Sequence, residues 1–344
     1  MRIRSISRGL LLLCALLCAL LVAACGSSTS QTATPPTATP APLTSAGTVS
    51  ATISGLGANP DHDDAIAASD TAIWVRNGAT GTLVRIAPTT NTIVATIPVG
   101  HGEGGVALGN GAVWVVNSVE GTVSRIDPQT NQVTATITLT SQGSEVTQAI
   151  AVSPDAVWVT QFSQNALVRI DPRTNQVVAT IAAQPGITGV SFGAESVWTC
   201  NHHDSAEGLA QVNPQTNQIQ AQIAVGDTGA GMACSSVVAL AQTVWTTSFS
   251  NEQYPTTLRR IDPAAHKVIA TIPIPQAVAA PFHFAANEQG VWLYGDAGVY
   301  RVDPATNRPV GLLDTQDPRG IALGAGSVWV CKSDGTLLRI TPAF

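Results

Sequence analysis

The stretch GVALGNGAVWVVNSVEGTVSRIDPQTNQVTATI (residues 105–137) decides the fold, because the chain repeats its pattern. The next copy reads AIAVSPDAVWVTQFSQNALVRIDPRTNQVVATI (residues 149–181). Each copy holds a short apolar strand, a Val-Trp strand, a strand ending in Arg-Ile-Asp-Pro, an Asn-centred turn and an Ala-Thr-Ile strand. Self-similarity with a period of about 40 residues indicates a repeat architecture.

All seven tryptophans of the chain occupy the same position in the repeat: Trp74, Trp114, Trp158, Trp198, Trp245, Trp292 and Trp329. Successive tryptophans are 37 to 47 residues apart, which is the length of one four-stranded propeller blade. The continuous apolar runs suit strands that are buried on both faces. We therefore predict an all-β fold, a seven-bladed β-propeller, in which the tryptophans pack between blades rather than form a ligand platform.

The two ends of the repeat region complement each other. We name the four strands of a blade A to D, from the propeller axis outward. The seventh unit stops after its strand C at Leu337–Ile340, whereas Val49–Ile53 matches the D strands of other units but follows no strands A to C. We predict that the N-terminal strand completes the last blade, because closure removes an open sheet edge. An open solenoid with frayed ends is the alternative.

The turn between strands C and D has a physical interpretation. In Asp127-Pro128-Gln129-Thr130-Asn131, the Asp side chain can accept the backbone N–H two residues on, Pro presets φ, and Asn tolerates a left-handed conformation. The turn recurs at Asp171, Asp262 and Asp303, and Asn213 takes the place of Asp in the fourth unit. We therefore expect these carboxylates to shape turns rather than to catalyse.

The N-terminus predicts export. Arg2, Arg4 and Arg8 precede an apolar run over residues 9–24 that is shorter than the roughly 20 residues of a membrane span, so residues 1–24 suit a signal peptide. The end of the run, Leu21-Val22-Ala23-Ala24-Cys25, resembles the lipobox of bacterial lipoproteins, which implies cleavage before Cys25 and acylation of its thiol. The alternative is ordinary secretory cleavage near Ala24.

Three segments follow from this interpretation: the lipoprotein signal (1–24), a Ser/Thr/Pro-rich disordered tether (25–46) and the propeller (47–344). We expect a lipid-anchored protein of the bacterial cell envelope, on the outer leaflet of the cytoplasmic membrane or the periplasmic or cell-surface side.

Without the signal, 13 basic and 22 acidic residues give a net charge of −9. Such a charge disfavours nucleic acid as a partner. We expect a monomer that meets the membrane through its acyl anchor.

The amino-acid sequence of the repeats resembles that of the YVTN-type propeller family and of virginiamycin B lyase-like propellers over residues 47–344. The residues that carry this resemblance are the Val-Trp of strand B, the Arg-Ile-Asp-Pro-x-Thr-Asn turn and Ala-Thr-Ile-Pro-Val-Gly at 95–100. The resemblance to the lyases implies metal-assisted proton abstraction from carbon. Those lyases commonly read Trp-Phe-Thr-Glu in strand B, whereas the third residue after each Trp is here Asn77, Asn117, Gln161, Asn201, Ser248, Gly295 and Lys332. Their catalytic residues therefore do not transfer to this chain.

Function is expected where the repeats differ. The B–C and D–A connections share one face of a propeller and vary in length and chemistry, whereas the A–B and C–D connections are short and alike. His266 lies in a C–D turn, and the other five histidines fall on the variable face: His62, His101, His202, His203 and His283. That face also carries Asp61, Asp63, Asp64, Glu103, Glu145, Asp204, Glu207, Asp317, Arg319 and Lys332.

Polar and aromatic residues of this face are concentrated in the units of blades four to six. They lie in Cys200–Asp204, Ser248–Thr256 and Phe282–Phe284, which predicts an apolar pocket with a few polar groups. The alternative is that long surface loops accumulate polar residues without a ligand. The ligand-binding candidates are His62, His101, Glu103, Asn201, His202, His203, Asp204, Tyr254, His283 and Lys332.

No cofactor is firmly implied, and a divalent cation is the one we consider. The weak metal candidates are Asp61, His62, Asp63, His203 and Asp204, whose spacing matches no known motif. Three thiols remain beside Cys25, and we expect buried free thiols, with a Cys200–Cys234 bond as the alternative. Overall the sequence favours a scaffold that binds a glycan, peptide or protein over an enzyme, and the alternative function is a metal-dependent lyase.

Overall fold

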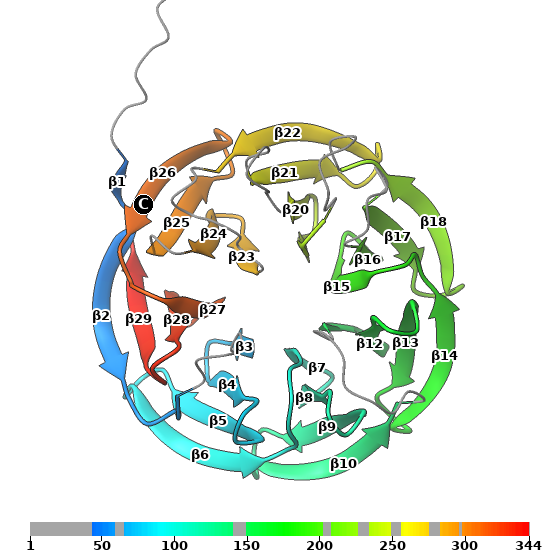
Figure 1. Ribbon diagram of the computed structural model, residues 1–344, viewed down its shortest axis with the longest axis horizontal. Helices are drawn as coiled ribbons and strands as arrows, with labels where there is room; N and C mark the ends of the chain where they lie inside the picture. The colour runs from blue at the N-terminus through cyan, green and yellow to red at the C-terminus, as the bar shows by residue number, and fades with distance from the viewer. Residues whose placement is uncertain are drawn as a thin grey trace, which may run out of the picture. The chain divides into compact units, whose positions relative to one another are not determined.

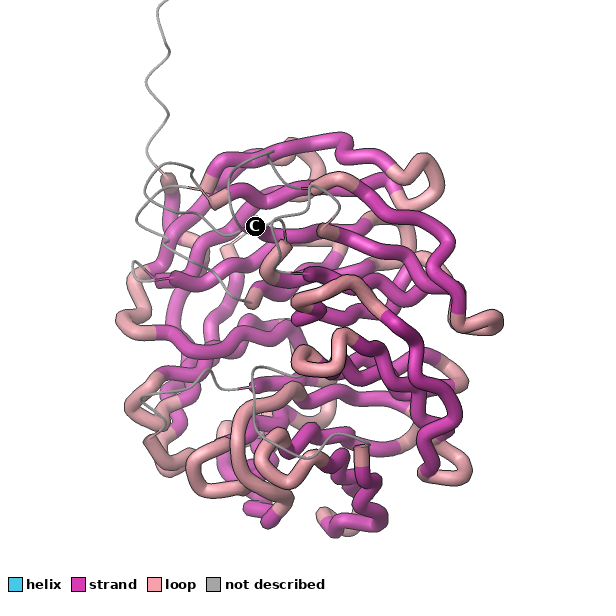
Figure 2. Tube along the Cα trace, turned by 45° about the vertical axis from the view of Figure 1, so that its right-hand side comes forward, coloured by secondary structure: helices cyan, strands magenta, loops and turns pink. Residues whose placement is uncertain are grey.

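A computed structural model describes residues 43–58, 65–139, 149–201, 208–225, 234–248, 256–274, 283–295 and 298–343. These residues form seven antiparallel sheets arranged in a ring around a central axis (Figure 1). Strands joined by short turns make up the structure, with no helix among the described residues (Figure 2). The same residues accordingly contain no helix long and apolar enough to cross a membrane. The predicted seven-bladed β-propeller is confirmed.

Each blade places its strands in the order A to D from the axis outward. The A strands are β3 (Ala65–Ala68), β7 (Val106–Gly109), β11 (Ile150–Ser153), β15 (Ile187–Gly193), β19 (Ser236–Ala239), β23 (Phe284–Asn287) and β27 (Pro318–Gly324). The B strands are β4 (Ile73–Asn77), β8 (Ala112–Asn117), β12 (Ala156–Gln161), β16 (Ser196–Asn201), β20 (Val244–Ser248), β24 (Gly290–Gly295) and β28 (Ser327–Lys332). The C strands are β5 (Thr82–Ala87), β9 (Thr122–Asp127), β13 (Ala166–Asp171), β17 (Leu209–Asn213), β21 (Thr257–Asp262), β25 (Gly298–Asp303) and β29 (Leu337–Pro342). The D strands of blades 1 to 6 are β6 (Thr92–Pro98), β10 (Gln132–Thr138), β14 (Gln176–Ala182), β18 (Gln218–Ile223), β22 (Lys267–Pro273) and β26 (Arg308–Leu313).

The D strand of blade 7 comes from the N-terminal side of the repeats, as predicted. This strand, β2 (Gly47–Ile53), pairs antiparallel with β29, from Gly47 opposite Pro342 to Ile53 opposite Leu337. The sequence did not predict a further short strand, β1 (Thr44–Ser45), which pairs parallel with the outer edge of β26. The chain therefore passes from the edge of blade 6 into blade 7, and Ala46 at the crossing is buried.

Gly311 of β26 makes that crossing possible. A Cβ at this position would lie 2.7 Å from Cα and 2.8 Å from N of Ala46, closer than real Cβ contacts. The repeat places Ala at the corresponding position of other outer strands, such as Ala95, Ala179 and Ala270. Glycine therefore stands where the N-terminal segment lies against the sheet.

The tryptophans form the core between blades, as predicted, because all seven are at most 1% exposed. In six blades an arginine of strand C lies over the ring, with the guanidinium carbon 5.2 to 5.6 Å from the ring centroid. At this distance the cation is attracted to the negative face of the ring. The arginine at this position of strand C therefore belongs to the core of six of the seven blades.

The same arginines connect neighbouring blades. Nη1 of Arg85 donates to the carbonyl oxygen of Pro128 at 2.6 Å and to Oδ1 of Asn131 at 2.9 Å, in the C–D turn of the next blade. Arg339 makes the same pair of bonds from blade 7 to Pro88 and Asn91 of blade 1. We call this arrangement the Arg–Asn latch. Blade 4 carries Gln211 in place of the arginine, and its Oε1 lies 2.7 Å from Nε2 of His266 in blade 5.

The C–D turns have the predicted chemistry. Oδ1 of Asp127 accepts the N–H of Gln129 at 2.7 Å, and Oδ1 of Asn213 accepts that of Gln215 at 2.8 Å. The last turn residue has a left-handed φ of 53° to 60° at Asn91, Asn131, Asn175, Asn217, His266 and Asn307. Each outer strand then contains one register shift at the same place, a β-bulge. Such bulges blunt the outer edges of the blades.

The expectation of free thiols is wrong for two of the three cysteines. Cys200 of β16 and Cys234, just before β19, form a disulfide with 5.4 Å between their Cα atoms, within the usual range. Sequence spacing could not place Cys234, because it lies in a connection of irregular length. Cys331, at the corresponding position of blade 7, is buried and is not part of a disulfide, as expected. The disulfide joins blades 4 and 5, the junction at which Gln211 and His266 replace the Arg–Asn latch.

Candidate functional site: the axial cavity

A cavity of about 530 Å³ lies on the propeller axis. It is lined by residues from the innermost strand of every blade and from the one to three residues just before that strand. Its volume is within the range of pockets that hold small organic ligands. We call the face with the B–C and D–A connections the loop end of the propeller and the opposite face the turn end. The lining comes mainly from the first residues of the A strands, so the cavity belongs to the loop end.

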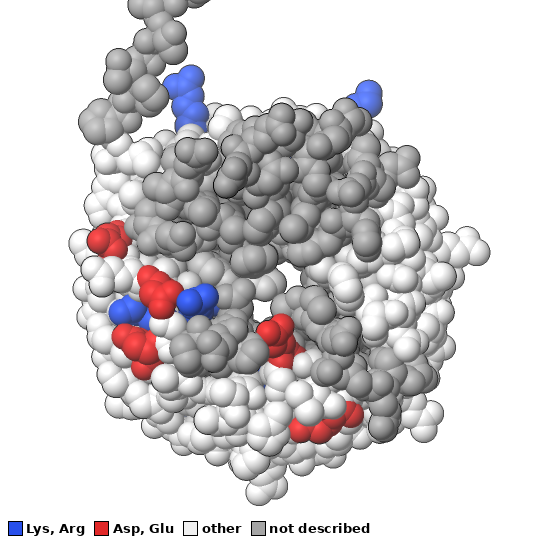
Figure 3. Space-filling view, viewed as in Figure 1, with Lys and Arg blue, Asp and Glu red and all other residues white. Residues whose placement is uncertain are grey.

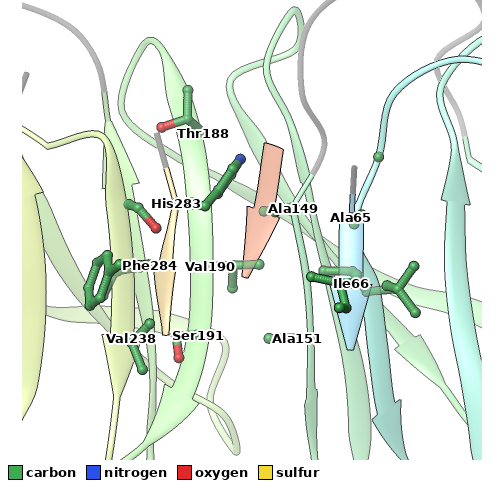
Figure 4. Close-up of a pocket in the computed structure, with 18 of the residues that line it drawn as sticks. Ala65, Ile66, Ala149, Ala151, Thr188, Val190, Ser191, Val238, His283 and Phe284 are labelled. Atoms are coloured by element: carbon green, nitrogen blue, oxygen red, sulfur yellow. The ribbon is translucent and has the colours of Figure 1, made fainter. Parts of the chain in front are cut away.

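Apolar side chains belong to half of the residues in the wall, 11 of 22. Ile66, Val106, Ile150, Val190 and Ile321 line the cavity from five blades. Figure 4 shows Ile66, Ala149 and Val190 around one space, with Thr188 and His283 toward one end and Ser191 and Val238 toward the other. Polar side chains therefore lie toward both ends of the cavity, with apolar ones between them.

Blades 4 and 5 contribute hydroxyl groups to the wall. Thr188 and Ser235 are 7% and 6% exposed, and neither Thr188 Oγ1 nor Ser235 Oγ has a hydrogen-bond partner among the described residues. A buried hydroxyl without a partner costs about 1–3 kcal/mol. Ser191 differs, because its Oγ accepts the N–H of Ala239 at 2.9 Å. Two residues of the cavity wall thus carry a buried hydroxyl that has no partner among the described residues.

Three titratable side chains line the cavity as well: Glu103, His283 and Arg319. They come from blades 2, 6 and 7. Nη2 of Arg319 lies 3.0 Å from Oδ1 of Asp317, so a carboxylate compensates the guanidinium charge. Figure 3 shows the opening at this face, with charged side chains of the described part beside it and over blade 7. The site therefore combines apolar walls, buried hydroxyls and ionisable groups.

The position of Glu103 is set by a glycine-rich segment and a buried arginine. Arg76 of β4 is 2% exposed and donates from Nη1 to the carbonyl oxygen of Gly102 and from Nη2 to that of Gly100, at 3.3 Å for the second bond. Gly104 has φ 153°, and a Cβ there would lie 2.6 Å from the carbonyl oxygen of Val116. The backbone on both sides of Glu103 is thereby held against blades 1 and 2.

Two predicted site residues lie at the loop end but outside the cavity wall. His101 is exposed, and its Nδ1 lies 3.2 Å from Oε1 of Glu120. Partial burial of Glu120 opposes ionisation, but the backbone N–H and the ring of His101 outweigh it and hold the pKa of Glu120 below its ordinary value. Lys332 lies with Nζ 3.2 Å from Oδ2 of Asp334. Both side chains therefore contact carboxylates at the surface.

Asn201 lies at the end of β16, and its Nδ2 donates to Oε1 of Gln184 in the connection before β15. Asn77 occupies the same position in blade 1, where its Nδ2 donates to the carbonyl oxygens of Leu56 and Gly57 at 3.2 and 3.0 Å. The third residue after the tryptophan thus holds a D–A connection in both blades. That position, which is Glu in the lyases, has a structural role here.

The remaining predicted site residues lie outside the described residues: Cys25, Asp61, His62, Asp63, His202, His203, Asp204 and Tyr254. The weak metal candidates are all among them. Within the described ranges, no group of three or more His, Cys, Asp or Glu side chains could hold a metal ion. The structure thus brings two of the ten ligand-binding candidates, Glu103 and His283, into one cavity.

Sequence reasoning missed Thr188, Ser235 and Arg76 as contributors to the site. Hydroxyl residues are common on this chain, and the repeat does not reveal which residue of strand A faces the axis. Arg76 carried a usable signal, because the second residue after the tryptophan is Val116, Thr160, Cys200, Thr247, Tyr294 or Cys331 in the other blades. A charged residue at a buried repeat position marks a specific interaction.

Residues 68–248, slightly more than half of the chain, match a family described as a repeat of unknown function, DUF6923. The chain belongs to this family. The match covers blades 1 to 4 and the start of blade 5, so the DUF6923 repeat corresponds to the propeller blades described above. Membership in the YVTN-type family stays a prediction. A comparison with curated protein sequences found no match.

Solved structures similar to this DUF6923 protein are propellers of diverse origin. Kuenenia stuttgartiensis hydrazine synthase superposes with a TM-score of 0.68 at 13% identity, covering 85% of this chain and 98% of that one. The Neurospora crassa Pan2 WD40 domain gives 0.65 at 12% identity, with 84% and 90% covered. Virginiamycin B lyase from Staphylococcus aureus gives 0.66 at 15% identity, with 85% and 99% covered. At such identities the similarity shows the fold alone, which confirms the resemblance to virginiamycin B lyase-like propellers at that level.

Proposed function

We propose that this protein is a lipid-anchored extracytoplasmic binding protein that takes a small ligand, or a short segment of a partner, into the axial cavity from the loop end. The observation that carries the proposal is the pair of buried hydroxyls, Thr188 Oγ1 and Ser235 Oγ, which line a cavity of about 530 Å³ and have no partner within the described part of the chain. A ligand that bonds to them recovers free energy that the empty cavity leaves unused.

The extracytoplasmic location is supported by two independent features. The Cys200–Cys234 disulfide suits an oxidising compartment, because such bonds are rare in the reducing cytosol. The sequence Leu21-Val22-Ala23-Ala24-Cys25 after an apolar run is the expected end of a lipoprotein signal. Two acyl chains or more would anchor the protein firmly, whereas one chain binds a bilayer only marginally.

Binding is favoured over lyase chemistry by the residues at the loop end. The similarity to virginiamycin B lyase is one of fold, and fold alone carries no activity. Asn77 and Asn201, at the position where the lyases have Glu, bind loop atoms instead. Apolar walls with a few polar groups are typical of a site that orients a ligand.

The experiment fills the cavity. Val190 lines it from blade 4 and is 8% exposed, so Val190→Trp should occupy much of the space. The matched control is Ile269→Trp, on the outer strand β22, where the side chain is 55% exposed. Both variants and the intact protein are screened by thermal shift against peptidoglycan fragments, short peptides, cyclic depsipeptides, amines and divalent cations.

We expect at least one compound class to raise the melting temperature of the intact protein and of the Ile269→Trp control but not that of Val190→Trp. Circular dichroism establishes that Val190→Trp is folded. If Ser235→Ala and Thr188→Val also weaken binding, the buried hydroxyls are confirmed as ligand contacts. Compounds that stabilise Val190→Trp as strongly as the intact protein, or no stabilising compound at all, would overturn the cavity as the binding site. A depsipeptide cleaved only with added metal would favour the lyase instead.

A further inference from the structure

The two ends of the propeller differ strongly in charge. The turn end carries eight acidic residues: Asp70, Asp127, Asp155, Asp171, Glu195, Asp262, Glu288 and Asp303. It also carries nine basic residues: Arg85, Arg125, Arg169, Arg173, Arg260, Lys267, Arg301, Arg308 and Arg339. Six of these arginines are the ones that stack on tryptophans inside the blades. The turn end is therefore close to neutral.

The loop end is acidic. Its described charged residues are Glu103, Glu120, Asp314, Asp317 and Asp334 against Arg76, Arg319 and Lys332, and one further arginine, Arg259, is buried within β21. The sequences that join strands at this end outside the described residues (59–64, 140–148, 202–207, 226–233, 249–255, 275–282 and 296–297) contain nine Asp or Glu and no Lys or Arg. Most of the negative charge of the mature chain therefore belongs to the end at which the cavity opens.

The basic residues of the loop end offer little to an anion. Arg319 is paired with Asp317 through Nη2 at 3.0 Å, whereas its Nε has no partner among the described residues, and Lys332 is paired with Asp334 at 3.2 Å. Arg76 is buried, with its guanidinium bonded to the carbonyl oxygens of Gly100 and Gly102. An anionic ligand would therefore meet compensated cations in a negative field, whereas a cation would be attracted by the same field.

The cavity lining suits a cation attached to an apolar body. Glu103 supplies a carboxylate, and the oxygens of Thr188 and Ser235 can accept hydrogen bonds from an ammonium group, which has three donors and no acceptor. The walls formed by Ile66, Ile150 and Val190 favour an apolar remainder. A hydrated metal ion would gain nothing from these walls.

The geometry points to an organic cation as the ligand of the axial cavity: a primary amine on an apolar body, with the ammonium group held by Glu103 and the hydroxyls of Thr188 and Ser235. This inference rests on the proposed binding function and names its ligand class. The acidic loop end draws the cation toward the cavity, and the apolar wall selects amines that carry a hydrophobic group over small hydrophilic ones.

The test uses three probes of similar size that differ in charge: 2-phenylethylamine, 2-phenylethanol and 3-phenylpropanoate. Their dissociation constants for the intact propeller are measured by calorimetry or ligand-observed NMR at pH 7.5, in 20 and 200 mM NaCl. We expect the amine to bind at least tenfold more tightly than the alcohol and the carboxylate to bind most weakly. The preference for the amine should shrink at the higher salt concentration, because salt screens the field of the loop end.

Two matched variants assign the preference to its cause. Glu103→Gln should remove most of the tenfold preference for the amine and leave the affinity for the alcohol unchanged. Glu288→Gln removes an acidic residue from the turn end and should leave all three affinities unchanged. Equal weakening of amine binding by the two variants would show that net charge, and not Glu103, is responsible, and would overturn the assignment.

The outcomes separate this inference from the proposed function. If all three probes bind with similar affinity and Val190→Trp abolishes their binding, the cavity is a binding site but the cation preference is wrong. If none of the probes binds, the ligand class is wrong, and the cavity itself is judged by the wider thermal-shift screen. Amine binding that Val190→Trp does not affect would place the amine elsewhere on the acidic surface and overturn the inference.

Discussion

Nε2 of His266 in blade 5 lies 2.7 Å from Oε1 of Gln211 in blade 4. The imidazole N–H donates to the amide oxygen, and Nε2 of Gln211 donates in turn to Oγ of Ser196 at 2.8 Å. These two residues stand at the positions that Arg and Asn hold in the latches of other blades, as in Arg85 with Asn131. At the junction of blades 4 and 5, both residues of the Arg–Asn latch are thus replaced, Arg by Gln211 and Asn by His266.

Restoring the Arg–Asn latch between blades 4 and 5 should reveal that positions 211 and 266 are coupled in their effect on the free energy of unfolding. The double variant Gln211→Arg with His266→Asn should be more stable than the intact protein by about 1 kcal/mol, because a charged donor and a stack on Trp198 are gained. Gln211→Arg alone should destabilise, since the guanidinium then meets an imidazole. A double-mutant cycle by urea unfolding measures the coupling, and a value within 0.5 kcal/mol of zero, roughly the additivity error, would contradict it.

Gly311 should not tolerate a side chain. Gly311→Ala would place a Cβ 2.7 Å from Cα of Ala46, and overpacking of this kind typically costs about 1–3 kcal/mol. The N-terminal segment at Thr44–Ala46 should detach from β26 first, which limited proteolysis and hydrogen exchange can detect. Ala270→Ser adds one atom at the corresponding position of β22 and serves as control. If Thr44–Ala46 is protected from proteolysis and hydrogen exchange equally well in Gly311→Ala and in the intact protein, the close packing of this segment against Gly311 would be refuted.

Acid should destabilise the C–D turns. Backbone N–H groups of the turns, that of Gln129 for Asp127 and that of Arg173 for Asp171, hold the pKa of both carboxyls below their ordinary value. The same is true of Asp262, chiefly through the N–H of Ala265, and of Asp303, through that of Ala305.

A carboxyl with a lowered folded-state pKa contributes its full stabilisation above the unfolded value near 4 and loses it as the pH falls through the folded value. Stability should therefore drop on acidification from about pH 5 to pH 2. Replacing all four Asp residues by Asn keeps a side-chain oxygen that accepts the turn N–H, as Asn213 shows. In this variant the urea midpoint should depend much less on pH over this range. An unchanged slope in the fourfold variant would assign the acid sensitivity to other groups.

Reduction should weaken the junction between blades 4 and 5 more than any other. The Cys200–Cys234 disulfide closes a loop with a sequence separation of 34, for which chain entropy gives about 3–4 kcal/mol. Cys200→Ala with Cys234→Ala should lower the melting temperature and should make the protein insensitive to dithiothreitol. Cys331→Ala, at the corresponding position of blade 7, is the control and should retain the response. A melting temperature of the intact protein that dithiothreitol does not change would argue against the bond.

The anchor prediction concerns Cys25. Cys25→Ser should give a chain that is not acylated and that stays unprocessed or is released, because the acceptor thiol is gone. In phase separation with Triton X-114 the intact protein should enter the detergent phase and the variant, once freed of its signal, the aqueous phase. Ser27→Ala, two residues further along the chain, is the matched control and should partition as the intact protein does. A processed Cys25→Ser chain that still enters the detergent phase would show that lipidation is not at this residue.

The sequence predicted the architecture because each blade repeats the same solution to the same packing problem. The repeat positions of Trp114, Asp127 and Asn131 have the same role in nearly every blade. A strand or turn that is ambiguous in one copy is therefore identified from the other copies. The parts it did not predict are those that occur once. β1 is two residues long, and Gly311 has meaning only when Ala46 lies against it.

The candidate site was predictable in part. Glu103 and His283 followed from the reasoning that titratable residues on variable connections mark function, and both line the cavity. Thr188 and Ser235 could not be predicted, because their importance comes from hydrogen-bond partners that are missing among the described residues, which only a three-dimensional arrangement reveals. His101 and Lys332 were chosen by the same reasoning as Glu103, yet each contacts a carboxylate at the surface and lies outside the cavity wall.

The pairing of β2 with β29 has a consequence for how the protein is made. β2 precedes the other blade strands in the chain and β29 follows them, so the ring cannot close until synthesis of all the blades is complete. Until then blade 7 lacks its outer strand, and β2 has no partner along its hydrogen-bonding edge. Pairing across nearly the whole chain is intrinsically slow to form. A chain interrupted before β29 would therefore be left with two unmatched edges and would be recognised by proteases, so that ring closure marks a finished molecule.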